Sequence, residues 1–118
     1  MKFICLLILL SLNPNTSNTE NPKSWGKGLA VVQYNAEFNK SNSVKNLQKI
    51  SDARIFNAWI DKHPELKEIG RIKSLPTIIV YKDGNEIRRW EAGIMMNLKI
   101  THHDVQDYID ELTGADKF

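Results

Sequence analysis

A continuous apolar run from Leu29 to Tyr34 constrains the fold of this chain more than any other sequence feature. The run reads Leu-Ala-Val-Val-Gln-Tyr, with Gln33 its one amide. Uninterrupted apolar runs are typical of parallel strands covered on both faces, whereas half-exposed strands alternate between apolar and polar residues. We therefore expect a buried parallel strand in an α/β protein. The length of 118 residues allows one domain.

The segment after this strand has apolar residues at helical spacing. Ser41 or Ser43 can cap a helix at its start. The inward-facing stripe of this expected helix is Val44, Leu47 and Ile50. A second strand is expected at 55–60, and a short helix at 63–69, with Pro64 in its first turn, where a missing N–H costs least.

A hairpin and a final helix complete the predicted elements. Asp83-Gly84 is a strong hairpin signal because both residues accept the positive φ that such turns need. The hairpin joins expected antiparallel strands at 77–81 and 86–90. The last helix starts near Thr101, with Asp104 as an approximate capping signal, and ends before Gly114. Its apolar stripe is Val105, Tyr108, Ile109 and Leu112.

Two blocks of the sequence resemble thioredoxin-like proteins. Residues 31–38 are similar to the family's apolar strand and to the Ala-Glu-aromatic step before its active-site turn. Residues 74–84 resemble the strand that begins at the family's cis-proline. Segments 59–61 and 69–72 also fit, so the resemblance runs from about Leu29 to Leu112. It implies a minimal β-α-β-α-β-β-α thioredoxin-like fold, an α/β three-layer sandwich with a central mixed sheet, without the first strand and helix of full-length thioredoxins.

The chain departs from that family where the family does its chemistry. Asn39-Lys40-Ser41-Asn42 occupies the place of the Cys-x-x-Cys pair, and Gln33 the place of the buried acid that moves protons. Dithiol exchange needs one thiolate to attack a disulfide and a second thiol to resolve the mixed disulfide. A carboxamide supplies neither. With Cys5 as the single cysteine of the sequence, we expect a redox-inactive relative.

The resemblance implies a binding surface that needs no thiol. In thioredoxin-like proteins the residue before the cis-proline pairs through its backbone with an extended peptide, as in strand addition. Here this residue is Leu75, and the Leu75-Pro76 bond is expected to be cis. The expected partner-binding groove contains Phe38, Asn39, Asn42, Leu75, Pro76 and Gly93. The plainer alternative is that Pro76 fixes the strand's entry and Phe38 packs in the core.

The first part of the chain reads as a leader and a linker. Residues 1–17 combine Lys2 with a short apolar run, as in a signal peptide, and are too short to span a bilayer, which takes roughly 20 apolar residues. Residues 18–28 form a polar linker, 29–113 the thioredoxin-like domain, and 114–118 a tail. The expected location is secreted or periplasmic, or membrane-tethered if the N-terminal hydrophobic segment is retained.

Composition gives little sign of other ligands. A net charge of +2 implies no nucleic-acid partner. His63, His102 and His103 have no cysteine or paired acid at ligand spacing, so neither a metal nor another cofactor is expected.

The adjacent residues Met95 and Met96 have two interpretations. They offer an adaptable apolar contact surface, or they cover the edge of the fold left open by the missing N-terminal elements.

Three interpretations of function remain from the sequence. The first is a redox-inactive module that binds a protein or an extended peptide, or serves as a subunit of an assembly. The second is a thiol-disulfide oxidoreductase that uses Cys5 or a cysteine supplied by a partner. The third is a purely structural protein whose groove is unused. The second would be refuted by a mature N-terminus beyond Cys5 and the absence of a mixed disulfide. In the third, mutations at Phe38 and Leu75 would change stability but no association, whereas in the first they would change association.

Overall fold

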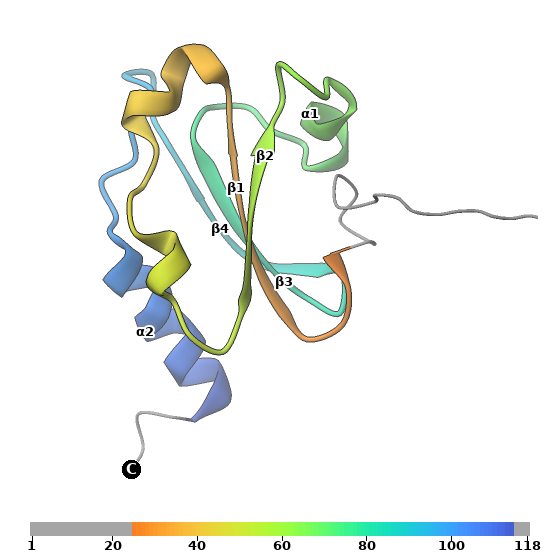
Figure 1. Cartoon of the computed structure of the whole chain (residues 1–118), viewed down its shortest axis with the longest axis vertical. Helices are drawn as coiled ribbons and strands as arrows, with labels where there is room; N and C mark the ends of the chain where they lie inside the picture. Colours follow the sequence, from red (N-terminus) through yellow and green to blue (C-terminus); the bar gives the residue numbers. More distant parts are fainter. Residues whose placement is uncertain (1–24, 115–118) are drawn as a thin grey trace, which may run out of the picture.

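The computed structural model describes residues 25–114 (Figure 1). The expected leader at 1–17, most of the expected linker and most of the expected tail lie outside the described residues. The elements in chain order are β1 (Leu29–Asn35), the 3-10 helices η4 (Glu37–Asn42) and η5 (Leu47–Lys49), β2 (Arg54–Trp59), α1 (Glu65–Ile69), β3 (Thr77–Lys82), β4 (Asn85–Glu91) and α2 (His102–Thr113).

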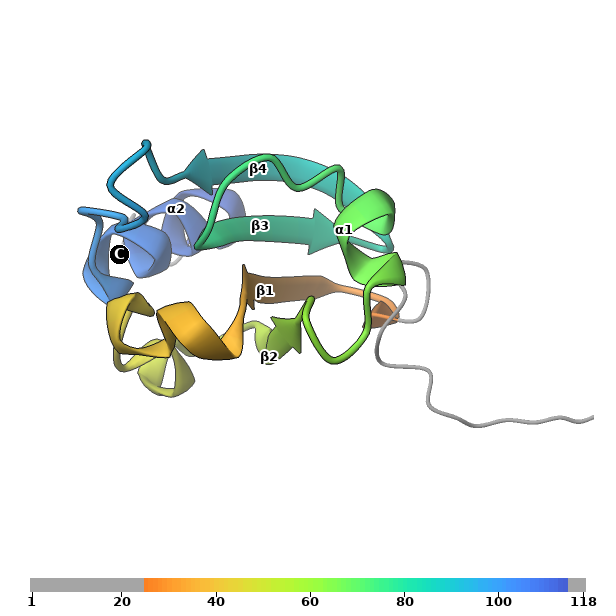
Figure 2. The ribbon, with the colours of Figure 1, turned by 90° about the horizontal axis from the view of Figure 1, so that it is seen from above.

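The four strands form one mixed sheet in the order β2-β1-β3-β4 (Figure 2). β1 runs parallel to β2 and antiparallel to β3, and β4 is antiparallel to β3. The two central strands are almost wholly buried, as their uninterrupted apolar sequences predict. The predicted α/β class and mixed sheet are confirmed.

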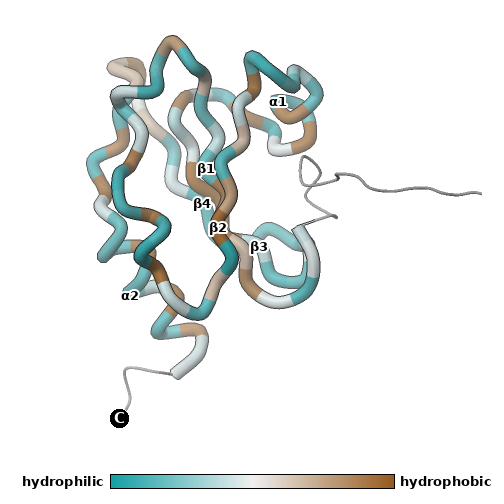
Figure 3. The backbone as a smooth tube through the Cα atoms, viewed as in Figure 1, coloured by the Kyte–Doolittle hydropathy of each residue, from teal (hydrophilic) through white to brown (hydrophobic). Residues whose placement is uncertain are grey.

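The sheet separates two hydrophobic clusters, and side-chain alternation along the strands assigns residues to one or the other. α1 covers one face, where Leu66 is fully buried beside Trp25. α2 covers the opposite face with Val105 and Ile109, together with the segment from η4 to η5. Figure 1 shows these layers on the two sides of the sheet, and Figure 3 shows the apolar stretches gathered in its centre.

The hairpin and the last helix have the turn chemistry expected of them. Asp83 and Gly84 have φ values of 52° and 85° between β3 and β4. The Thr101 N–H donates to the Asp104 carboxylate at 2.8 Å at the start of α2. Gly114 follows α2 with a φ of 76°, in the left-handed conformation typical of a helix C-terminus. None of the helices within residues 25–114 is long and apolar enough to cross a bilayer.

The helix predicted from Ser41 or Ser43 is wrong, because two 3-10 helices take its place. The side chain of Gln33 holds the backbone of Val44 outside helical geometry: Gln33 Oε1 accepts its N–H at 2.7 Å and Gln33 Nε2 donates to its carbonyl at 3.3 Å. Asn46 then turns the chain with a φ of 66°. The predicted apolar stripe is buried all the same, and consists of Val44, Leu47 and Ile50.

Candidate functional site

An amide cluster forms at the segment that the sequence resemblance places at the redox pair of thioredoxin-like proteins. Asn39 is only 5% exposed, and its Nδ2 donates to Asn35 Oδ1 and to the Met96 carbonyl, both at 3.1 Å. Asn42 Nδ2 donates to Asn39 Oδ1 at 2.8 Å. Asn35 Nδ2 donates to the Asn39 carbonyl and to Ser43 Oγ. These bonds tie β1 and η4 to the loop at Met96, so the Asn39 carboxamide is already engaged by the protein itself.

Gln33 has a similar internal role. It is 3% exposed, and both ends of its amide bind the backbone of Val44. A neutral amide can satisfy a donor and an acceptor together, whereas an ionised acid could only accept. Gln33, which the resemblance places at the family's buried acid, therefore fixes the backbone after η4 through Val44.

The loop before β3 borders an apolar hollow of about 510 Å³, which we call the Leu75 groove. It lies where the chain passes from α1 into β3, next to the segment that follows β4. Its lining is Ile60, Lys67, Ile72, Lys73, Ser74, Leu75, Ala92, Gly93, Ile94 and Met96. The Leu75-Pro76 peptide bond is cis, and the Pro76 carbonyl accepts the N–H of Ala92 at 3.2 Å.

Leu75 presents unused backbone groups at this groove. Within residues 25–114, neither its N–H nor its C=O forms a hydrogen bond. Its neighbours are held on both sides, because the Ser74 carbonyl accepts from Thr77 Oγ1 at 2.8 Å and Pro76 is tied to Ala92. Unpaired backbone groups on a residue that is only 8% exposed are rare in proteins, since their burial costs free energy.

The sequence-predicted site residues are partly brought together. Leu75 and Gly93 both line the groove, and a Cβ placed on Gly93 would have no atom within 4 Å, so the space beside it is open. Phe38 does not line the groove and is 75% exposed. Asn39 and Asn42 do not line the groove either, although Asn39 donates to the carbonyl of Met96, which does.

A second hollow, of about 460 Å³, lies on the other side of the loop that follows β4. Gly93 and Ile94 line both hollows, and Ile94 is 96% exposed. Met95 beside it is also exposed. The loop is therefore an apolar ridge between two depressions. Sequence reasoning noted Met95-Met96 here but missed Ile94. The loop that places Ile94 in the groove has no apolar period or turn motif that could have predicted it.

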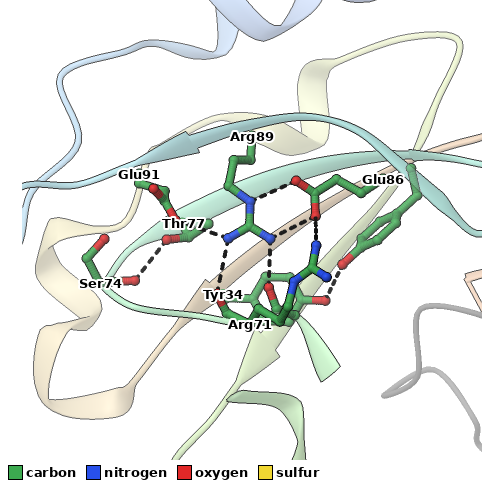
Figure 4. A network of polar contacts seen from close by, with 9 residues as sticks. Tyr34, Arg71, Ser74, Thr77, Glu86, Arg89 and Glu91 are labelled. Atoms are coloured by element: carbon green, nitrogen blue, oxygen red, sulfur yellow. Dashed lines mark hydrogen bonds and ion pairs between the residues drawn. The ribbon is translucent and has the colours of Figure 1, made fainter. Parts of the chain in front are cut away.

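A network of charges fixes the start of the groove loop (Figure 4). Arg89 donates to the carbonyls of Gly70 and Arg71 at 2.7 and 3.2 Å, just after α1. The same guanidinium binds both carboxylate oxygens of Glu86, from Nε and Nη2, and Glu91 at 3.0 Å. The hydrogen bond from Arg89 lowers the pKa of Glu86. Sequence reasoning missed this network, because residues three apart on a regular strand point to opposite faces, and the irregular pairing of β3 with β4 brings Glu86 and Arg89 together.

Two tyrosines lie buried near this network. The hydroxyls of Tyr34 and Tyr81 are 2.7 Å apart and form a hydrogen bond. Burial raises the pKa of both phenols, that of Tyr81 the more strongly. Each ring is part of the hydrophobic cluster on the α1 face. The two hydroxyls therefore satisfy each other's hydrogen bonding within the core.

The three histidines do not gather. His102 and His103 stack on each other at 4.1 Å at the start of α2, and His63 lies beside Glu65. Among the residues that the structure describes, no three His, Cys, Asp or Glu side chains are grouped as metal ligands would be.

Comparison with solved structures identifies the fold as that of thioredoxin. A mutant thioredoxin from Halobacterium salinarum superposes with a TM-score of 0.58 at 16% identity, over 72% of this chain and 74% of that one. Schistosoma mansoni thioredoxin gives 0.56 at 23% identity over 72% and 77%. Oxidised thioredoxin from Plasmodium falciparum gives 0.56 at 19% identity over 81% and 92%. No protein-family model matches the sequence, and neither does any curated protein.

The chain thus has a thioredoxin-like fold without the dithiol of thioredoxins. Its single cysteine, Cys5, lies outside the described residues. The expectation of a thioredoxin-like chain without a Cys-x-x-Cys motif is confirmed.

Proposed function

We propose that this chain is a redox-inactive thioredoxin-fold module that binds an extended segment of another protein in the Leu75 groove. The segment adds to the backbone of Leu75 as a strand adds to a sheet edge, and one of its apolar side chains enters the hollow. If residues 1–17 act as a leader, this binding takes place in the periplasm or outside the cell.

The unpaired backbone of Leu75 carries the proposal. An N–H and a C=O on the same residue are the two groups that a partner strand uses, and Leu75 offers both without a partner in the described chain. The adjoining hollow of about 510 Å³ is in the size range of small-ligand pockets and is lined mainly by apolar side chains. A peptide therefore finds hydrogen bonds and an apolar pocket side by side.

Two further features support the same site. The open space beside Gly93 lets a partner backbone approach closely. Phe38, Ile94 and Met95 are at least three-quarters exposed, and exposed apolar groups on this scale are typical of interaction sites when they gather. In the proposal Phe38 and Asn42 are outer contacts, while Leu75, Pro76 and Gly93 form the centre.

A single substitution can block this groove without disturbing the core. Gly93 does not have a positive φ, and an added Cβ meets open space, so Gly93→Leu should fold normally and fill the hollow with its side chain. The matched control is Gln48→Leu, which adds the same side chain to the exposed face of η5.

The test is selection from a library of random linear peptides, followed by amide chemical shifts of the protein with each enriched peptide. We expect peptides rich in apolar residues, a shift of the Leu75 amide resonance, and loss of binding in Gly93→Leu but not in Gln48→Leu. The proposal fails if no peptide is enriched. It also fails if enriched peptides bind Gly93→Leu as well as wild type.

A further inference from the structure

Given the proposed function, on which this inference rests, the charged side chains around the Leu75 groove indicate which peptides it binds. Lys67 comes from α1 and Lys73 from the loop before β3, and both line the hollow. Its lining includes no Asp or Glu. The polar part of the groove is therefore cationic.

The two lysines differ from the arginines of this region because they form no ion pair with a carboxylate of the described residues. Arg89 is bound to Glu86 and Glu91, and Arg71 lies 3.9 Å from Glu86. By contrast, neither Lys67 nor Lys73 has an ion pair within residues 25–114.

Three carboxylates of this part of the molecule are bound to other cations. Glu86 and Glu91 face Arg89 at 2.7 and 3.0 Å. Glu37 is shared between Lys40 and Lys62. An acidic group brought by a ligand would therefore meet two ammonium groups that form no ion pair within residues 25–114.

We infer that the Leu75 groove selects extended peptides in which an apolar anchor residue has Asp or Glu two positions before or after it. The apolar side chain fills the space between Ile72, Leu75 and Ile94, and the acidic side chains face Lys67 and Lys73. Because alternate side chains of an extended chain point to the same side, residues two positions from the anchor lie on the groove side of the peptide, at the rim of the hollow. Both lysines are exposed, so they reach that rim.

The size of the effect follows from the exposure of these lysines. Exposed ion pairs contribute about 0 to 1 kcal/mol each, which corresponds to up to roughly a fivefold change in affinity per lysine. Two such pairs give an expected preference on the order of tenfold at low salt. The preference should shrink at high ionic strength, where the Debye length falls to about 3 Å at 1 M.

The probes are three peptides with blocked ends and the same apolar anchor, which carry Asp, Asn or Lys two positions before and two positions after it. Their affinities are measured by fluorescence anisotropy against wild type and against the double variant Lys67→Gln, Lys73→Gln. The matched control is Lys45→Gln, Lys82→Gln, which removes two exposed lysines that do not line the groove. Gly93→Leu reports whether binding is in the groove at all.

We expect wild type and the control to bind in the order Asp, Asn, Lys, and the Lys67, Lys73 variant to lose most of the difference. Equal binding of the Asp and Asn peptides, or a preference that survives in that variant, overturns the acidic selectivity while leaving the groove proposal intact. Failure of all three peptides to bind overturns both. Tighter binding of anionic lipid vesicles than of the Asp peptide, lost in the same variant, also overturns the inference and makes the surface a membrane contact.

Discussion

The Arg89 network and the Leu75 groove lie at the two ends of the loop from Gly70 to Leu75. They differ in whether their polar groups have hydrogen-bond partners. At the start of the loop the Arg89 guanidinium meets two carbonyls and two carboxylates. At its end, within the part of the chain that the structure describes, Leu75 keeps an N–H and a C=O without partners, and Lys67 and Lys73 beside it form no ion pair. Satisfied polar groups stabilise a fold, whereas unsatisfied ones next to an open apolar hollow are available to a ligand.

The segment from Asn39 to Asn42 resembles the Arg89 network, because its polar side chains have partners within the protein. The amides of Asn35, Asn39 and Asn42 bind one another and the Met96 carbonyl. This corner of the molecule is therefore closed by its own hydrogen bonds, in contrast to the backbone of Leu75, which has no partner within residues 25–114.

The largest effect is expected from Arg89→Met, which keeps much of the side-chain bulk and removes the charge. Glu86, Glu91 and the carbonyls of Gly70 and Arg71 lose their donor, and Arg89 is only 19% exposed. Hydrogen bonds to charged groups contribute about 1.5 to 3 kcal/mol, so we expect the free energy of unfolding to fall by about 2 to 3 kcal/mol in urea denaturation.

Arg88→Met is the control for that experiment. Arg88 is exposed and lies over the ring of Trp90 at 4.7 Å, a contact of about 0.5 to 1 kcal/mol at exposed sites. If Arg88→Met destabilises the protein as much as Arg89→Met does, the Arg89 network does not hold the groove loop as described.

A smaller effect is expected from Tyr81→Phe, which leaves the Tyr34 hydroxyl without its buried partner. At neutral pH the loss should be about 1 kcal/mol. Above the unfolded-state pKa of about 10, unfolding releases phenol protons that the folded protein retains, because burial raises the pKa of both tyrosines. Wild-type stability should therefore fall as the pH rises beyond about 10, and Tyr81→Phe should fall less steeply because it has one such proton fewer.

Urea denaturation at neutral pH and at about pH 11 measures both parts of this prediction. Tyr108→Phe serves as the comparison, since the Tyr108 hydroxyl makes only a long, exposed bond of 3.4 Å. A wild-type stability that is unchanged at the alkaline pH would show that the tyrosine protons are not retained by the folded state.

The strands were the part of the fold that the sequence predicted best, for a physical reason. The runs at 29–34 and 77–81 are buried on both faces, and Asp83-Gly84 accepts the positive φ of its turn. The α-helix expected from Ser41 or Ser43 does not form, although its apolar residues have helical spacing. Gln33 binds the backbone of Val44 instead. This contact joins residues 11 apart in sequence, so the local spacing of apolar residues could not reveal it.

The resemblance to a known family named six residues for the candidate site. Of these, Leu75 and Gly93 line the groove, and Pro76 follows Leu75. Whether they bind a partner stays a prediction. Lys67, Lys73 and Ile94 carry no local signal, since an exposed lysine or a single loop isoleucine is ordinary in sequence. Their significance comes from the loop geometry that places them around one hollow.

The smallest effect on stability, and the most informative for the groove, is expected from Phe38→Ala. The Phe38 ring is 75% exposed, so its loss should change the free energy of unfolding by less than about 0.5 kcal/mol in urea denaturation. Affinity for a groove-binding peptide should weaken by a few-fold at most, less than in Gly93→Leu, because Phe38 is an outer contact that does not line the hollow. A loss of stability above about 1 kcal/mol would place the ring in the core. Loss of binding as complete as in Gly93→Leu would move the centre of the site from Leu75 to the turn after β1.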